Sequence, residues 1–323
     1  MLVFLYGPDA YRSQEKQLLF QERFLSEGGS SSGIRHIDVE EWNEEDVISK
    51  FKTILTTRDL FNVKTCICIR GFFSLPKNNR DALADFFAKE YNDNEERMII
   101  IRETAVNKVF RIFKILKKKA ALAEEFFLLK EKDLTLWAKQ YCSKQYPDFR
   151  FEEDALLYIL KQSMGDLFRF IHEVEKLSLI CDEKKYITKE DTNRYIARTP
   201  SSAIFDLLDS LGSGNRGLSF DLLSEQYDQE IPPEQIFAML FYHVNNCARI
   251  ISLYEEENIH NYYEIASKAR VHPYVAQKTI QGRSKISLQR AKSMIQILAR
   301  FDRAIKSGKI HVKAAIEEFI SRA

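Results

Sequence analysis

"LVFLYGPDAYRS", residues 2–13, is the stretch that decides the fold. An apolar run that passes through a glycine turn into a helical pattern is typical of a phosphate-binding loop, in which glycines let backbone N–H groups close on the phosphates. Such a loop ends in Gly-Lys-Ser/Thr, where the lysine reaches the outer phosphate oxygens and the hydroxyl binds magnesium. This stretch keeps only Gly7 and has Arg12 and Ser13 where that ending would fall. We therefore expect a strand–loop–helix unit that does not hydrolyse nucleotide.

A second element of nucleotide chemistry is also missing from the sequence. An ATPase of this kind commonly carries Asp-Glu after an apolar strand beside the loop, to hold magnesium through water. Here the run "TCICI", residues 65–69, is followed by Arg70-Gly71. The sequence therefore predicts no nucleotide cofactor and no metal site. A degenerate ATPase domain and an α/β domain that never bound nucleotide both fit these residues.

Four further apolar segments follow the first, separated by helical stretches. They are "GIRHIDV" (33–39), "TCICIRG" (65–71), "RMIIIRE" (97–103) and "AEEFFLL" (123–129). Alternating strands and helices predict a parallel sheet with helices on both faces. The continuous hydrophobicity of residues 97–103 is typical of a strand that is buried on both sides. The Gly/Ser-rich stretch 27–34 predicts a flexible surface loop before the second strand.

The pattern becomes helical, with no strand-like run, after about residue 131. The whole chain has only 11 glycines and 7 prolines, which favours long regular elements. Residues 166–179 carry an amphipathic stripe, and residues 287–307 form the strongest helical pattern, with Ser287 as N-cap and Gly308 at the end. We expect a second long helix after Pro232-Pro233. These segments predict helical domains that pack as bundles.

Composition limits the function classes. The net charge of +1 means that any nucleic-acid contact depends on local clusters. No apolar run approaches the ~18 residues that a membrane span needs, and Met1 leads directly into a strand-like run without a signal-peptide pattern. The five cysteines show no metal-ligand spacing, so we expect buried free thiols. We expect a cytoplasmic protein that does not contact a membrane.

The sequence offers no candidate catalytic residue. The six histidines are scattered, and we expect His243, which lies within an apolar helical stripe, to be a hydrogen-bonded core residue. Lys117–Lys119 close a predicted helix, where cations favour the helix dipole but could also contact phosphate. A second basic cluster could contact a nucleic-acid backbone or a partner's acidic residues; it comprises Lys278, Arg283, Lys285 and Arg290. Neither cluster has interleaved aromatic residues for base stacking.

"TTRDLFNVK", residues 56–64, is the most informative local feature. Polar residues flank the apolar pair Leu60-Phe61. The pair could be tucked into its own domain, or it could project and anchor a partner. Burying both side chains in a partner would supply about 1.5–3 kcal/mol each, enough for an interaction hot spot.

Five segments in order give the chain a family resemblance. They are "RDLFNVKTCICIR" (58–70), "MGDLFRFIHEVEKLSLI" (164–180), "IFDLLDSL" (204–211), "VHPYVAQKTIQ" (271–281) and "ILARFDRAIKSGKI" (297–310). With the lysine-free loop before them, they resemble the delta-subunit family of the bacterial DNA polymerase III clamp loader over essentially the whole chain. Leu60-Phe61, Asp302 and Lys306-Ser307-Gly308 match the family's pattern, although fewer basic residues follow Phe61 than in many members.

The resemblance implies an α/β plus all-α fold in three domains. These are an AAA+-like parallel-sheet domain without a functional P-loop (1–131), a small helical lid (132–200) and a C-terminal helical collar that joins other subunits (201–323). It also implies a subunit without intrinsic catalysis in a DNA-directed DNA polymerase (nucleotidyltransferase) holoenzyme. Such a subunit binds the beta sliding clamp and helps open it for loading onto primed DNA during replication. The family's clamp-binding wedge carries over to Leu60 and Phe61, with Arg58 and Asp59 as neighbours.

The implied partners are the clamp, the loader's ATPase and delta-prime subunits through the collar, and primed DNA within the assembled complex. The ATPase subunits keep Gly-Lys-Ser/Thr, which this chain lacks. Two alternatives belong to other classes. A self-standing P-loop-fold ATPase would turn over ATP in a manner that depends on Gly7. A DNA-binding helical adaptor would lose DNA affinity steeply with salt and show no clamp affinity.

Overall fold

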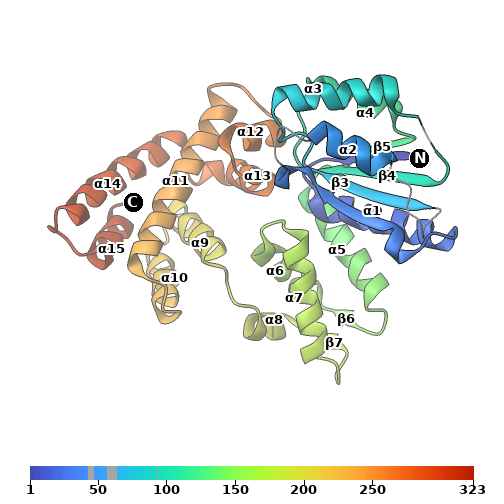
Figure 1. Ribbon diagram of the computed structural model, residues 1–323. Coiled ribbons are helices and arrows are strands. Elements are labelled where there is room, and N and C mark those ends of the chain that lie inside the picture. The colour runs from blue at the N-terminus through green and yellow to red at the C-terminus, as the bar shows by residue number, and fades with distance from the viewer. Residues whose placement is uncertain (43–46, 57–63, 93) are drawn as a thin grey trace. The chain divides into compact units, whose positions relative to one another are not determined.

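The computed structural model describes residues 1–42, 47–56, 64–92 and 94–323. The chain divides into two compact units, residues 1–129 and 130–323. The first unit is α/β and the second is almost entirely helical, so the predicted fold class is confirmed (Figure 1). The three domain ranges 1–131, 132–200 and 201–323 stay a prediction.

The first unit is built on a five-stranded parallel sheet. Its strands are β1 (Leu2–Tyr6), β2 (Ile34–Asp38), β3 (Thr65–Arg70), β4 (Arg97–Glu103) and β5 (Leu122–Glu125). Its main helices are α1 (Ala10–Ser26), α2 (Val47–Thr56), α3 (Lys77–Asp85) and α4 (Arg111–Lys119). Short 3₁₀ turns lie at Ser31–Gly33 and Val39–Glu41, and a π-helical segment, Phe86–Glu90, continues α3. The strand order is β2-β3-β4-β1-β5, and every pair is parallel. The predicted strands and their parallel pairing are therefore confirmed.

Both faces of this sheet are covered, as the continuous apolar runs predict. Alternate residues of β1 enter two different cores: Phe4 packs with the residues of α2, α3 and α4, and Leu5 packs with Phe24 of α1. Figure 1 shows α1 on one face of the sheet and α2, α3 and α4 on the other. Parallel sheets need this two-sided cover because their strands are apolar on both faces.

The Gly/Ser-rich stretch is exposed over most of residues 27–32, as expected for a surface loop, and it ends in a regular turn. Residues Ser31–Gly33 form a 3₁₀ turn that is capped by the Ser30 hydroxyl, and Gly33 is buried. A Cβ at Gly33 would lie 2.8 Å from the carbonyl oxygen of Lys64, so the backbone there passes close to the start of β3. At Gly33 the absence of a side chain allows this close approach of the two backbone segments.

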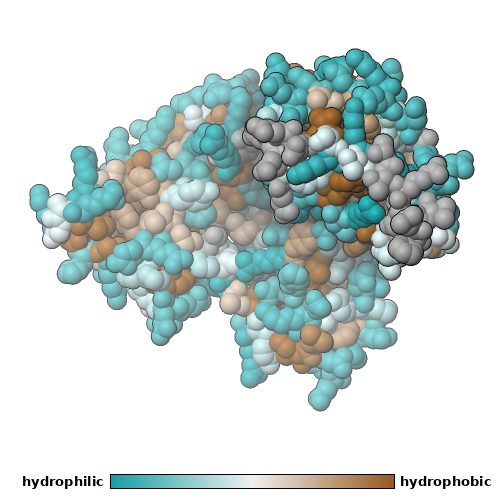
Figure 2. Space-filling view, viewed as in Figure 1, coloured by the Kyte–Doolittle hydropathy of each residue, from teal (hydrophilic) through white to brown (hydrophobic). Residues whose placement is uncertain are grey.

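The second unit begins with α5 (Glu131–Gln145), α6 (Glu153–Ser163), α7 (Leu167–Ile180) and α8 (Lys189–Tyr195). Two short strands, β6 (Arg150–Phe151) and β7 (Tyr186–Ile187), pair in parallel between these helices. The expectation of no strand after residue 131 is therefore wrong, because two-residue strands are too short for a hydrophobic period to indicate them. Figure 2 shows a small hydrophobic patch at the end of α7, where Leu179 and Ile180 are exposed.

The rest of the second unit is a helical bundle. Its helices are α9 (Pro200–Gly212), α10 (Arg216–Asp228), α11 (Pro233–Glu255), α12 (Tyr262–Ala269), α13 (Pro273–Gln281), α14 (Leu288–Lys306) and α15 (Val312–Arg322), with a 3₁₀ turn at Gly282–Ser284. One core joins α9, α10, α11, α14 and α15, and a second joins the end of α11 to α12 and α13. Ser287 caps α14, and Gly308 follows it with φ of +70°, as predicted.

Helix α11 is the central helix of this bundle. It is the only helix among the described residues that is long and apolar enough to cross a membrane, and 61% of its apolar window is buried inside the protein. Its apolar residues pack in the two cores of the bundle, which accounts for its composition. His243 is buried on this helix as expected, but its Nδ1 atom has no hydrogen-bond partner, and burial lowers the pKa of His243 to about 4.

Candidate functional site

The loop between β1 and α1 is the first candidate site. Gly7 has φ of +126°, a left-handed conformation that favours glycine. A Cβ at Gly7 would lie 2.4 Å from the carbonyl oxygen of Phe126, which follows β5. The chain after β5 therefore runs directly against the loop and occupies the space beside Gly7.

Backbone donors of this loop are already bound to the protein itself. The Gly7 N–H donates to the Glu103 carbonyl oxygen at 2.9 Å, and the Asp9 N–H donates to the Phe126 carbonyl oxygen at 3.1 Å. In a phosphate-binding loop such N–H groups would instead point at the ligand. The loop keeps the backbone turn of a phosphate-binding loop, but two of its donors are used to join β1, β4 and the chain after β5.

Arg12 and Ser13 also have structural partners. One guanidinium nitrogen of Arg12 (Nη1) lies 3.4 Å from Asp9 Oδ2 and donates to the Phe127 carbonyl oxygen at 3.2 Å. The Ser13 hydroxyl is fully buried and donates to the Ala10 carbonyl oxygen at 3.0 Å. Neither side chain is in a position to replace the missing lysine or the magnesium-binding hydroxyl without breaking these bonds.

Asp9 organises the start of α1. It is 2% exposed, and its carboxylate accepts from the Arg12 N–H at 2.9 Å as the N-cap of the helix. Burial raises the pKa of Asp9, and the hydrogen bonds and the charge of Arg12 oppose that effect. A carboxylate at this helix N-terminus occupies the place where a helix dipole would attract a phosphate.

Glu103, at the carboxyl end of β4 beside the loop at Gly7, was not among the residues predicted from the sequence. Its side chain lies at the carboxyl end of β4, is 6% exposed and accepts from the Phe72 N–H at 2.7 Å. Burial raises the pKa of Glu103 to about 8, although the N–H groups of Phe72 and Gly71 favour the charged form. It lines a 300 Å³ hollow with Arg70 and Asp38, which form an ion pair at 2.7 Å. The only sequence signal for Glu103 is its place at the end of an apolar strand.

The predicted clamp-binding residues, Arg58, Asp59, Leu60 and Phe61, lie outside the described residues. The elements on either side of them are α2, which ends at Thr56, and β3, which starts at Thr65. Because the strands are parallel, Thr65 lies at the edge of the sheet opposite to Gly7. Among the described residues, no group of three or more His, Cys, Asp or Glu side chains could hold a metal ion.

The basic residues separate into different environments. Lys117–Lys119 are exposed in the last turn of α4, as predicted for a helix C-terminus. Arg290 is used inside the protein, where it donates to the carbonyl oxygens of Leu211, Gly212 and Ala323. Arg283 likewise donates to the carbonyl oxygen of Ile280, so the predicted second basic cluster does not act as one surface.

A parallel sheet in this order, with a glycine loop after β1 and helical elements following, defines an AAA+-like fold. Comparison with known proteins makes the relationship more specific. Residues 201–323 match the family model described as "DNA polymerase III delta subunit, C-terminal domain". DNA polymerase III subunit delta of Bacillus subtilis (strain 168) is 22% identical over 332 residues, which cover 98% of this chain and 90% of that protein.

A solved delta-protein structure agrees with the sequence comparison. The Bacillus subtilis DNA clamp loader delta protein superposes with a TM-score of 0.73 at 19% identity, covering 99% of this chain and 94% of that one. The Thermotoga maritima RuvB Holliday junction branch migration motor gives a TM-score of 0.42 at 13% identity, covering 85% of this chain and 79% of that one. The family model, the curated Bacillus subtilis relative and the solved Bacillus subtilis delta structure confirm the predicted resemblance to the DNA polymerase III delta subunit.

Proposed function

We propose that this chain is a non-hydrolysing clamp-loader subunit that binds a sliding clamp and helps open it during DNA replication. The observation that carries the proposal is the closed loop at Gly7, in a chain that is similar over 98% of its length to a DNA polymerase III delta subunit. A loop whose N–H groups donate to backbone carbonyl oxygens elsewhere in the same chain is suited to a structural role in a larger assembly. The subunit would act in the cytoplasm as a non-catalytic part of the polymerase holoenzyme.

The proposed mechanism is differential binding to two states of the clamp. A protein that fits the curvature of an open ring better than that of a closed ring shifts the ring toward opening, by no more than its difference in binding free energy. Leu60 and Phe61 would supply the apolar contact, with Arg58 and Asp59 beside them. The C-terminal bundle would join the ATPase and delta-prime subunits, and primed DNA would be bound only in the assembled complex.

The direct test replaces the proposed apolar wedge. We expect Leu60→Ala combined with Phe61→Ala to weaken binding of a cognate sliding clamp at least 100-fold, because two buried hot-spot side chains are lost. Binding is measured by surface plasmon resonance and by co-elution on a sizing column. Circular dichroism should be unchanged, since the pair is proposed to project from the domain.

The matched control is Leu18→Ala combined with Leu19→Ala, which removes two exposed apolar side chains from α1. This control should bind the clamp as the unaltered protein does. Clamp binding at full strength by the Leu60/Phe61 variant would contradict the proposal that these two side chains bind the clamp. ATP turnover by the isolated chain that disappears in Gly7→Ala would instead favour a self-standing ATPase.

A further inference from the structure

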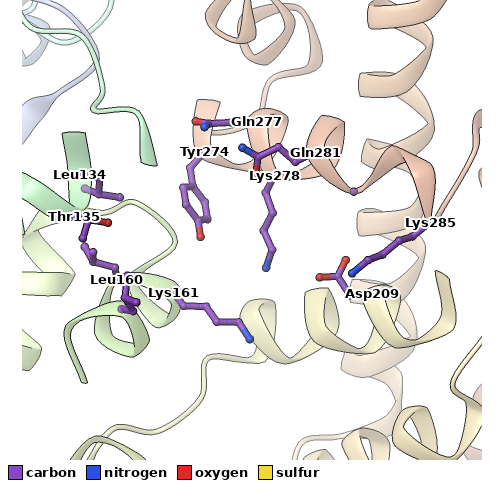
Figure 3. Close-up of a pocket in the computed structure, with 12 residues that line it drawn as sticks. Leu134, Thr135, Leu160, Lys161, Asp209, Tyr274, Gln277, Lys278, Gln281 and Lys285 are labelled. Carbon is purple, nitrogen blue, oxygen red and sulfur yellow. The ribbon is translucent and has the colours of Figure 1, made fainter. Parts of the chain in front are cut away.

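The second unit contains a hollow in which three lysine side chains meet. The hollow has a volume of 450 Å³ and is lined by residues of α5, α6, α9 and α13. Lys161 comes from α6, Lys278 from α13, and Lys285 from the segment that follows α13. In Figure 3 the ammonium groups of Lys161 and Lys278 point into the same space, with Lys285 beside Asp209.

The positive charge in this hollow is only partly compensated. Lys161 pairs with Asp206 at 2.8 Å. Among the described residues, no carboxylate oxygen lies within 4.0 Å of the ammonium group of Lys278 or of Lys285. Asp209 lines the space, and Asp206 lies beside it as the ion-pair partner of Lys161. Three ammonium groups therefore face two carboxylates.

The ammonium group of Lys278 lies where burial disfavours its positive charge. Its side chain is half-buried, and its Nζ atom lies over the Phe205 ring, 5.0 Å from the ring centre, in a cation–π contact. Burial lowers the pKa of Lys278, and the nearby charges of Asp209 and Asp206 oppose that effect. A half-buried cation without an ion-pair partner is a position at which an anionic ligand would be stabilising.

The remaining walls fit the organic part of a ligand. Leu134, Leu157 and Leu160 contribute apolar lining. In Figure 3 the Tyr274 ring lies between Leu134 and Lys278. Gln277 and Gln281 add amide groups at the upper rim. Ligand sites commonly combine an apolar lining with a few convergent polar groups in this way.

We propose that this hollow binds a small organic phosphate. The phosphate would lie among Lys161, Lys278 and Lys285, because lysine ammonium groups bind phosphate as point charges. The apolar or aromatic part would lie against the leucines and Tyr274. The site joins α6 to α9 and α13, lies far in sequence from the loop at Gly7, and does not depend on the proposed clamp binding.

The test uses the full-length chain and phenyl phosphate, titrated calorimetrically at low salt in a buffer without phosphate. Saturable binding at one site is expected, at least threefold tighter than that of inorganic phosphate because the ring contacts the apolar wall. Lys278→Gln combined with Lys285→Gln should weaken binding about tenfold or more, since two of the three cations are lost. Asp209→Asn should strengthen it at least threefold, because it removes a repulsive charge.

The matched control is Lys144→Gln combined with Lys309→Gln, which removes two exposed lysines of the same unit outside the hollow. It should change the affinity less than twofold. Absence of saturable binding by the unaltered chain would overturn the proposal, as would equal losses in the control and the Lys278/Lys285 variant. Equal affinity for phenyl phosphate and inorganic phosphate would overturn the claim that the hollow also binds an organic group. Thermal unfolding of each variant checks that it is folded.

Discussion

At the residue scale, Glu103 shows how this fold uses the position where nucleotide chemistry would lie. The carboxyl group is buried at the end of β4 and accepts a backbone N–H from Phe72, while its own carbonyl oxygen accepts from Gly7. One residue thus connects the loop after β1 to the chain after β3. The pKa of Glu103 is raised because burial disfavours the charged form of its carboxyl group.

We predict that Glu103→Gln stabilises the protein at high pH. The pKa of Glu103 is about 8 in the folded state, against an ordinary value of 4.5, so the folded state binds the extra proton between these pH values. Stability from this group is fully present below about pH 4.5 and is lost as the pH rises through 8. Glutamine cannot ionise and can still accept from Phe72. The gain in unfolding free energy should be small near pH 5 and roughly 2 kcal/mol or more at pH 9.

Urea unfolding at several pH values measures this effect. Glu95→Gln, which changes an exposed glutamate of the same unit, is the control and should shift stability little at any pH. A gain for Glu103→Gln that did not vary between pH 5 and pH 9 would show that the carboxyl group is not buried in an uncharged form.

At the element scale, the C-terminal bundle is closed by Arg290 near the start of α14. Its guanidinium donates to Leu211 and Gly212 at the end of α9 and to Ala323 after α15. Helix ends leave carbonyl groups without partners inside the helix, and this one side chain satisfies carbonyls at the ends of two helices. Its planar group with several donors suits that task better than a lysine would.

We predict that Arg290→Ala lowers the unfolding free energy of the second unit by about 1–3 kcal/mol, because three partly buried carbonyl groups lose a charged donor. Thermal and urea unfolding measure the loss. The control is Arg300→Ala, an exposed arginine of the same helix α14, which carries the same change in helix propensity. If both variants lose the same stability, the contacts of Arg290 with α9 and Ala323 contribute nothing.

At the scale of the whole molecule, each of the two units has hydrophobic cores of its own. Independent cores favour separate cooperative transitions, since multidomain chains depart from two-state behaviour. The two tryptophans provide a reporter for each unit: Trp42 packs beside the core of the first, and Trp137 stacks on Tyr141 in the second.

We predict that Glu103→Gln at pH 9 raises the midpoint of the unfolding transition that Trp42 fluorescence reports. The midpoint of the transition that Trp137 fluorescence reports should not change. Measuring it requires two backgrounds, Trp137→Phe and Trp42→Phe, so that each unit is observed alone. The reason is that the change in proton binding is confined to the first unit. Equal shifts of both transitions would show that the units unfold together.

The sequence by itself determined most of the local structure. Continuous apolar runs predicted the buried parallel strands, and the Ser287 cap and Gly308 marked the ends of α14, because these signals depend on near neighbours along the chain. The missing Gly-Lys-Ser/Thr ending likewise needed no coordinates. The short strands β6 and β7 and the turn at Ser31–Gly33 gave no such local signal.

Only the tertiary structure decided what surrounds these residues. Phe126 closes the loop at Gly7, and Glu103 joins it from another strand, although both lie about a hundred residues away in the sequence. The basic residues near 280 looked alike in sequence, yet Arg290 is bound inside the bundle and Lys278 faces a hollow. Local periodicity places a side chain on a helix face, but burial and charge pairing depend on elements that are distant in the chain and meet only on folding.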